Sequence, residues 1–230
     1  MAAVAPPATF PRLAPLGLVS PGVCPAGDEV WASLLSSNAL FATAGECPPA
    51  DGVSVAHRAS LVVGQSPSAV VVTCADSRLS PELLFARGLG ELFVIRSAGN
   101  TSADDSTVAS VEFAVKNLGS PLVVVLGHSS CGAVAAAVAT AADPKAMAEQ
   151  PPTLAAFVKS VLVAPVVAVK QKRGGVTGDD FMAACEVENV ATSVRTLLTS
   201  SGWLAKARVA GTVKVVGAMY DLATGLVSEC

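Results

Sequence analysis

The stretch AVVVTCADSR (residues 69–78) begins as an apolar run and ends in a thiol, a carboxylate and a guanidinium. Its first five residues are small or β-branched, which predicts a strand buried on both faces of a sheet. Cys74, Asp76 and Arg78 follow where this strand ends. Polar side chains at the carboxyl end of a buried strand are typical of a functional site, not of a core.

A second stretch of the same kind, PLVVVLGHSSCGAV, covers residues 121–134. Its apolar half predicts another buried strand, after which come His128 and then Cys131, where a helix is expected to begin. If the two strands are parallel neighbours, their carboxyl ends meet and bring Cys74 together with these two side chains. A thiol at the start of a helix is also favoured as a thiolate by the helix dipole.

Strands and helices alternate along the chain, which predicts an α/β fold. We expect a mostly parallel central sheet covered by helices on both faces, with an N-terminal helical arm and an antiparallel edge at the C-terminus. The other predicted strands lie at 91–96 and, as a hairpin, at 213–230. Predicted helices lie at 28–43, 80–88 (Ser80 as N-cap), 106–119 (Ser106 as N-cap, Gly119 as stop), 155–172 (kinked or broken at Pro165) and 179–202.

The domain organisation is expected to be simple. Residues 1–27 are rich in Pro, Ala and Gly and predict an extended or disordered arm, which would also suit the remnant of a targeting sequence. Residues 28–230 show no internal repeat and no linker, so they predict one domain.

Composition limits the partners of the chain. Charged residues make up 14% of it, against about 25% in an average globular protein, which favours a surface partly covered by another subunit. The net charge of −3 provides neither the basic footprint of a nucleic-acid binder nor a polybasic patch for a membrane surface.

Cysteine spacing and hydropathy indicate a compartment. The six cysteines are scattered, unlike the framework of a small disulfide-bonded secreted domain. We expect no membrane span, because no apolar run of about 18 residues is free of polar interruption, and no secretory signal. These patterns predict a cytoplasmic protein or one of an organelle stroma or matrix, with a plastid included, and not a secreted protein.

Two thiols and an imidazole suit Zn²⁺, which keeps one coordination position open in catalytic sites with three protein ligands. The Arg78 charge would keep Asp76 ionised and able to accept a hydrogen bond from a zinc-bound water. The alternatives are buried apolar cysteines and a plain ion pair that closes a turn. His57 is expected to be structural or exposed, and four cysteines are expected to be non-catalytic: Cys24, Cys47, Cys185 and Cys230.

The motif CADSR (74–78) followed by GHSSCG (127–132) resembles the β-class carbonic anhydrases, in their bacterial-type branch. Blocks on either side match the family in order, from about residue 60 to 228, with a fainter match at 28–43. The resemblance implies reversible hydration of carbon dioxide to bicarbonate and a proton. It also implies one Zn²⁺ per chain, bound by Cys74, His128 and Cys131.

The resemblance assigns further roles. Asp76 and Arg78 form a dyad that orients the zinc-bound hydroxide, and Asp76 becomes a fourth zinc ligand only in a closed resting state. Gln65, Phe93 and Ala98 match positions of the carbon dioxide pocket, with the glutamine supplied by the neighbouring subunit. The family implies a homodimer or a higher even-numbered oligomer.

Two positions depart from the family pattern. Ser97 stands where asparagine is frequent and Phe113 where tyrosine is frequent, so we expect a changed rate or pH profile but the same chemistry. Three other functions remain open. They are hydrolysis of carbon disulfide or carbonyl sulfide on the same scaffold, a non-catalytic zinc-stabilised assembly protein, and a thiol enzyme with Cys74 as nucleophile.

Overall fold

The computed structural model describes residues 22–44, 50–172 and 177–230. Most of the predicted arm at 1–27, and Cys47, lie outside the described residues. The first helix, α1, begins at Pro25 and continues to Ala44, so it starts slightly earlier than expected.

A five-stranded sheet in the order β2-β1-β3-β4-β5 forms the centre of the molecule. The first four strands are parallel, and β5 pairs antiparallel with β4 at the edge. This arrangement confirms the predicted α/β class and the antiparallel C-terminal edge. The strands are β1 (Ala69–Cys74), β2 (Leu92–Ser97), β3 (Leu122–His128), β4 (Lys214–Tyr220) and β5 (Val227–Glu229).

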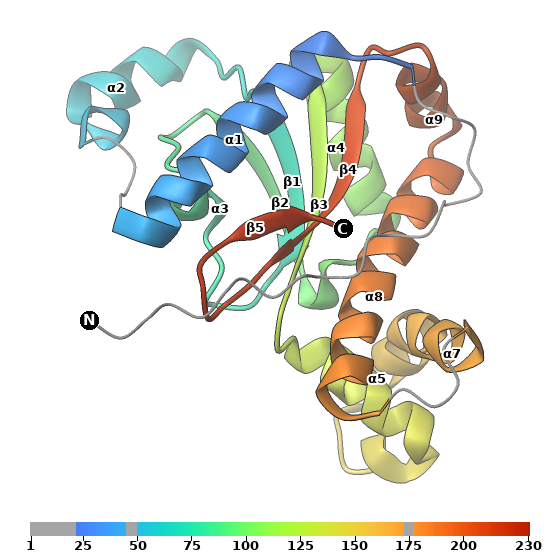
Figure 1. Ribbon diagram of the computed structural model, residues 1–230. Coiled ribbons are helices and arrows are strands. Elements are labelled where there is room, and N and C mark those ends of the chain that lie inside the picture. Colours follow the sequence, from blue (N-terminus) through green and yellow to red (C-terminus); the bar gives the residue numbers. More distant parts are fainter. Residues whose placement is uncertain (1–21, 45–49, 173–176) are drawn as a thin grey trace.

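Helices cover both faces of the sheet, and a helical lobe extends beyond the carboxyl ends of its strands (Figure 1). The α-helices after α1 are α2 (Val55–Ser60), α3 (Pro81–Leu84), α4 (Asp105–Asn117), α5 (Gly132–Ala142), α6 (Pro152–Phe157), α7 (Val163–Lys172), α8 (Gly178–Ser200) and α9 (Gly202–Val209). The short helices are η1 (Ala50–Val53), η2 (Leu61–Val63), η3 (Ala98–Asn100), η4 (Pro144–Met147) and the π-helical η5 (Val158–Leu162).

Alternation along β1 divides the core into two layers. Val70 and Val72 pack with α4, α8 and α9, whereas Ala69 and Val71 pack with α1 and α3 on the other face. All six residues of β1 are buried, because side chains that alternate between two covered faces must be apolar on both.

The lobe beyond the strand ends is built from α5, η5, α7 and the first part of α8. The predicted break at Pro165 does not occur, since the helical path runs from Pro152 to Lys172. Instead, the π-helical turn η5 directly precedes α7. A proline ring crowds the carbonyl oxygen four residues before it, here that of Val161, and a wider turn relieves this contact.

Among the described residues, this helical path is long and apolar enough to cross a membrane by length and composition only, with a mean hydropathy of 1.9 and 28% of its apolar window buried. Its Val158, Leu162 and Val166 side chains are buried in the cluster formed with α5 and α8. Lys159 and Ser160 interrupt the apolar run, so the expectation of no uninterrupted span of about 18 apolar residues is not contradicted.

Several predicted helix boundaries are wrong, and the helix expected at 80–88 already ends at Leu84. The N-cap of α4 is Asp104, whose carboxylate accepts hydrogen bonds from the backbone N–H and the hydroxyl of Thr107. Ser106 is therefore inside the helix. The long helix expected at 179–202 ends at Ser200, and Ser201 caps the separate helix α9 by accepting a hydrogen bond from the Leu204 N–H.

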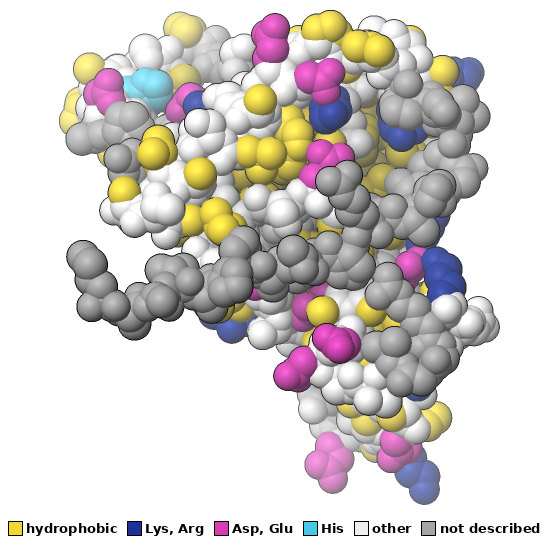
Figure 2. Space-filling model, in the orientation of Figure 1, with side chains coloured by type: hydrophobic (Ala, Val, Ile, Leu, Met, Phe, Trp, Pro, Cys, Tyr) yellow, Lys and Arg dark blue, Asp and Glu magenta, His cyan; other side chains and the backbone are white. Residues whose placement is uncertain are grey.

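Hydrophobic side chains remain exposed around α1 and α2, interspersed with charged ones (Figure 2). Val55, Val62 and Val63 are 73%, 84% and 96% exposed, although burying an apolar side chain lowers the free energy of the protein. These valines form an apolar surface on the segment that leads into β1.

One buried amide joins α1 to the C-terminal hairpin. The Asn38 side chain donates to the carbonyl oxygens of Leu84 and Gly225, and its oxygen accepts from the Val227 N–H. Asn38 is 1% exposed, so without its amide these backbone groups would lose their hydrogen-bond partner, and water would not replace it.

Asn38→Leu is expected to lower the free energy of unfolding by about 1–3 kcal/mol, because it leaves buried backbone groups unpaired. Urea unfolding followed by tryptophan fluorescence measures the change. Leu40→Ala, at a half-exposed position of the same helix, is the control and should change stability by less than about 0.5 kcal/mol. Equal effects of the two substitutions would contradict the role given to the amide.

Candidate metal centre

The centre lies where two neighbouring parallel strands end. β1 pairs with β3 in a register that places Thr73 beside Leu126, and the Thr73 hydroxyl donates to the Leu126 carbonyl oxygen at 3.0 Å. Cys74 is the last residue of β1 and His128 the last of β3. Cys131 follows as the N-cap of α5, as the sequence predicts.

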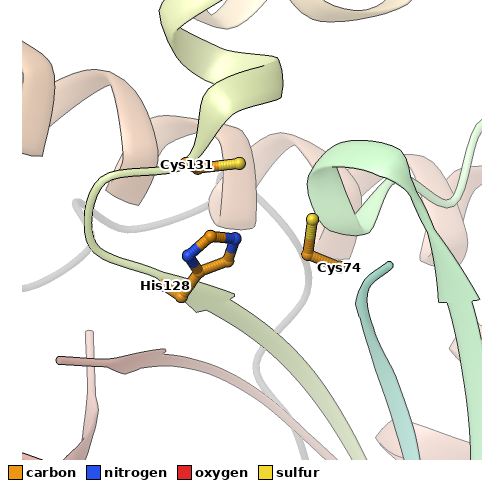
Figure 3. Close-up of side chains that lie close together, drawn as sticks. All are labelled: Cys74, His128 and Cys131. Atoms are coloured by element: carbon orange, nitrogen blue, oxygen red, sulfur yellow. The ribbon is translucent and has the colours of Figure 1, made fainter. Parts of the chain in front are cut away.

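The three side chains turn toward one another (Figure 3). One donor atom from each of Cys74, His128 and Cys131 lies within 4.8 Å of the others, and all three residues are buried. The sequence prediction that these residues converge is therefore confirmed by the geometry.

The orientation of the imidazole leaves one nitrogen free for a ligand. His128 Nδ1 lies 2.9 Å from the Ser129 carbonyl oxygen, to which it donates in the tautomer that this contact favours. Its Nε2 is buried and has no hydrogen-bond partner among the described residues. A buried unpaired nitrogen aimed at two sulfurs is the arrangement of a metal-binding histidine, whose other nitrogen is usually held by a carbonyl or carboxylate.

The two thiols shift each other's pKa in opposite directions. The hydrogen bond from Cys131 lowers the pKa of Cys74 to about 3, against the effect of burial and with help from His128 and from the Gly99 N–H. The same contact raises the pKa of Cys131. Metal ligation requires the thiolate form, which the surroundings of Cys74 already favour.

Gly99 supports the Cys74 sulfur from the backbone. Its N–H donates to Cys74 Sγ at 3.3 Å, from the turn η3 that directly follows β2. Its φ of +73° is in the left-handed region, which glycine adopts without a steric penalty.

Asp76 and Arg78 form a two-point ion pair beside the sulfurs. Arg78 Nε donates to Asp76 Oδ1 at 2.9 Å and its terminal nitrogen donates to Oδ2 at 2.7 Å. This contact holds the pKa of Asp76 well below its usual range, so the carboxylate is ionised. Oδ2 lies 3.9 Å from His128 Nε2 and therefore faces the donor cluster.

Arg96 is a member of the site that sequence reasoning missed. It belongs to β2, one residue before the strand ends, and its guanidinium donates to the Asp76 carbonyl oxygen at 2.7 Å. The sequence signal that identified Asp76 and Arg78 was also present here, because Arg96 is a charged residue at the end of an apolar strand.

The predicted pocket residues are dispersed within one chain. Ala98 lies in η3 beside Gly99 and is exposed. Phe93 lies on β2 opposite Val70, far from the end of the strand, and its ring is 6.4 Å from that of Phe113. Gln65 is exposed and precedes the opposite, amino-terminal end of β1.

The remaining histidine and cysteines lie apart from this cluster. His57 is partly exposed and its Nε2 is 2.9 Å from the Leu89 carbonyl oxygen. The described cysteines outside the cluster are buried and form no disulfide: Cys24, Cys185 and Cys230.

The donor set fits a metal ion. Two sulfurs and an imidazole nitrogen are ligands for a soft or borderline divalent cation, not for Mg²⁺ or Ca²⁺, which prefer oxygen. The buried and unpaired Nε2 of His128, which lies close to both sulfurs, fits a ligand of such an ion.

Comparisons with known proteins agree with this geometry. Residues 69–227 match the family model described as carbonic anhydrase. A carbonic anhydrase of Mycolicibacterium smegmatis is 38% identical over 199 residues, which cover 86% of this chain and 90% of that protein. Carbonic anhydrase 2 of Mycobacterium tuberculosis is 39% identical over 198 residues, which cover 85% of this chain and 88% of that protein.

A solved structure shares the fold. The Coccomyxa β-carbonic anhydrase, crystallised in complex with acetazolamide, superposes with a TM-score of 0.66 and 25% sequence identity. The match covers 88% of this chain and 82% of the algal chain.

Gly99→Ala is expected to destabilise the metal-free protein more than Gly119→Ala. Both glycines have φ near +73°, at which an alanine costs about 1–2 kcal/mol. At Gly99 the added Cβ would lie 3.0 Å from Leu162 Cδ2, whereas no described atom lies within 4 Å of it at Gly119. Urea unfolding of both variants measures the difference, and equal losses would show that η3 is not tightly packed.

Proposed function

Since the chain belongs to the carbonic anhydrase family and has the fold of its β class, we propose that it is a zinc-dependent carbonic anhydrase. Members of this family are lyases that act on carbon dioxide and bicarbonate. In our proposal one Zn²⁺ per chain is held by Cys74, His128 and Cys131. The observation that carries the proposal is the convergence of these donors beside an ionised carboxylate.

Zinc is favoured by the chemistry of the donors. Three protein ligands of this kind leave one tetrahedral position open, as in catalytic zinc sites. When bound, the ion would act as a Lewis acid that lowers the pKa of a water ligand. Carbonic anhydrases with three histidine ligands are the standard example of this effect, with a value of about 7. Thiolates donate more charge than imidazoles, so the effect should be smaller here.

The protein contributes orientation and charge. Asp76 Oδ2 faces the donor cluster and would accept a hydrogen bond from the attacking water, which fixes where its oxygen lone pair points. Arg78 holds this carboxylate at two points and also donates to the Ser130 carbonyl oxygen at 3.3 Å. The water oxygen would bond to the carbon of carbon dioxide while one C=O π pair moves onto its oxygen, and the water would lose one proton to buffer, which gives bicarbonate.

The intact ion pair supports an open site. A carboxylate that accepts two hydrogen bonds from one guanidinium is not available as a metal ligand in the same position. Arg96 adds to this by holding the Asp76 carbonyl oxygen. We therefore propose that Asp76 acts here as a hydrogen-bond acceptor and becomes a ligand only if Arg78 releases it.

A second copy of the chain is part of the proposal. Gln65 precedes Ala69, and β1 then rises about 3.3 Å per residue to Cys74, so the two lie at opposite ends of the strand. The glutamine cannot reach the metal centre of its own chain. We propose that it lines the pocket of a neighbouring subunit in a homodimer or larger even-numbered oligomer, with Phe93 beside it. The exposed Val62 and Val63 would be buried in that contact.

Asp76→Asn and Arg78→Ala are each expected to lower the rate of carbon dioxide hydration by about 100-fold or more, because the attacking water loses its oriented acceptor. Stopped-flow hydration is measured with zinc content on the same samples. Asp105→Asn, an exposed carboxylate of α4, is the control and should keep the wild-type rate. Zinc should remain bound in all three variants.

Other outcomes separate the alternatives. Loss of zinc in the Asp76 or Arg78 variant would show that the pair is structural. Zinc-loaded wild-type protein that hydrates no carbon dioxide would favour the carbon disulfide or carbonyl sulfide hydrolase, or the non-catalytic protein. Protein that binds no zinc would return Cys74 to consideration as a nucleophile.

Val63→Glu is expected to shift the protein toward the monomer and to lower hydration, because a carboxylate would replace an apolar contact of the proposed interface. Burying a valine contributes about 1.5–3 kcal/mol. Light scattering coupled to size-exclusion chromatography measures the mass. Val167→Glu, at an exposed position of α7, is the control that should leave the assembly unchanged. An unaltered oligomer with Val63→Glu would place the interface elsewhere.

A further inference from the structure

Helix α8 carries a buried carboxylate and a buried amide on a mostly aliphatic face. Glu186 and Asn189 are 4% and 3% exposed, and one turn separates them, so they share a face of the helix. The same face carries Val190, Val194 and Leu197. Burying a carboxylate and an amide costs free energy unless each is hydrogen-bonded, so their partners indicate why they are there.

The partner of Glu186 is the loop between two donors of the metal centre. Its Oε1 accepts from the Cys131 N–H at 2.9 Å, and the Ser130 backbone also hydrogen-bonds to it. Ser130 has a φ of +56°, which is unfavourable for a residue with a side chain. A buried carboxylate thus holds a strained loop at the point where it sets the direction of the Cys131 side chain.

The partner of Asn189 is the turn that supports the other sulfur. Its amide donates to the Gly99 carbonyl oxygen at 2.7 Å and to Asn100 Oδ1 at 3.4 Å. Gly99 and Asn100 both have positive φ, and the Gly99 N–H donates to Cys74 Sγ. The amide therefore holds the second strained segment of the site.

Helix α8 also packs closely on β3, the strand that carries the third donor, His128. A Cβ on Gly127, the residue before His128, would lie 2.5 Å from Val190 Cγ2 and 2.9 Å from Met219 Sδ. Only a residue without a side chain lets the helix approach the strand this closely. One helix therefore touches all three segments that carry the donors.

We propose that Glu186 and Asn189 are positioning residues that hold the Ser130–Cys131 loop and the turn η3, and so place both sulfurs for the metal before it binds. The inference rests on the proposed function, because it takes Cys74, His128 and Cys131 as the ligands. Neither residue touches the substrate in this role. Each acts through a backbone segment, as outer-shell partners of metal ligands do.

The test uses Zn²⁺ and Co²⁺ as probes of the purified full-length protein. Glu186→Leu and Asn189→Leu should each weaken zinc affinity about 10–100-fold, as loss of an outer-shell partner does. Competition with a chromophoric chelator measures the affinity. Glu186→Gln should recover part of the loss, because its amide oxygen can still accept from the Cys131 N–H.

The sulfur-to-cobalt charge-transfer band gives a second readout besides affinity and activity. Asn189→Leu should move this band to lower energy, since a thiolate with a weaker N–H hydrogen bond is a better electron donor. Glu188→Leu is the matched control on the same helix. Glu188 pairs with Lys172 and Arg195 instead of the site, so this variant should keep the wild-type affinity and spectrum.

The outcomes distinguish this inference from the function on which it rests. Wild-type protein with no cobalt-thiolate band would overturn the ligand assignment itself. A wild-type band together with unchanged affinity and spectrum in folded Glu186→Leu and Asn189→Leu would overturn only the positioning role. If Glu186→Leu does not fold, as judged by circular dichroism, Asn189→Leu decides by the same two readouts.

Discussion

The parallel pairing of β1 with β3 is the constraint on which the site depends. It brings the end of one strand beside the end of the other, so that Cys74 meets His128 from a distant part of the chain. The Thr73 hydroxyl reinforces this register at the last pair before the site, through its bond to the Leu126 carbonyl oxygen. A slip by one residue would move every side chain of the strand to the opposite face.

Around this junction the protein concentrates polar and charged groups. Arg78 binds the carboxylate of Asp76 and Arg96 binds its backbone carbonyl oxygen. From α8, Glu186 binds the loop before α5 and Asn189 binds the turn η3. The contacts of Glu186 and Asn189 satisfy buried groups, whereas the contacts of Arg78 and Arg96 lie at the exposed rim of the site.

The opposite end of the sheet has a different character. There the segment before β1 exposes Val62, Val63 and Gln65. In the proposed assembly this end of one subunit completes the pocket of another, so the apolar surface and the distant glutamine have one explanation. The sparse charge of the chain agrees with burial of this surface between copies.

Particular residues show how far the sequence alone reaches. Buried strands ending in Cys74 and in His128 identified the α/β class and the donor residues, because hydrophobic period and residue chemistry are local properties. That the two strands are neighbours came from the sheet order of the structure. Local preference was not sufficient at Asp104, where a carboxylate caps α4 in place of Ser106, nor at Pro165, where a π-helical turn keeps the helix continuous.

The sequence by itself thus determined the class of fold, the donor chemistry and the Asp76–Arg78 pair, which lie within two short motifs. Only the tertiary structure decided that Arg96, Glu186 and Asn189 belong to the site. These three relations join residues of different strands and helices, and their distances depend on how whole elements pack. No local pattern of a single chain segment records such packing.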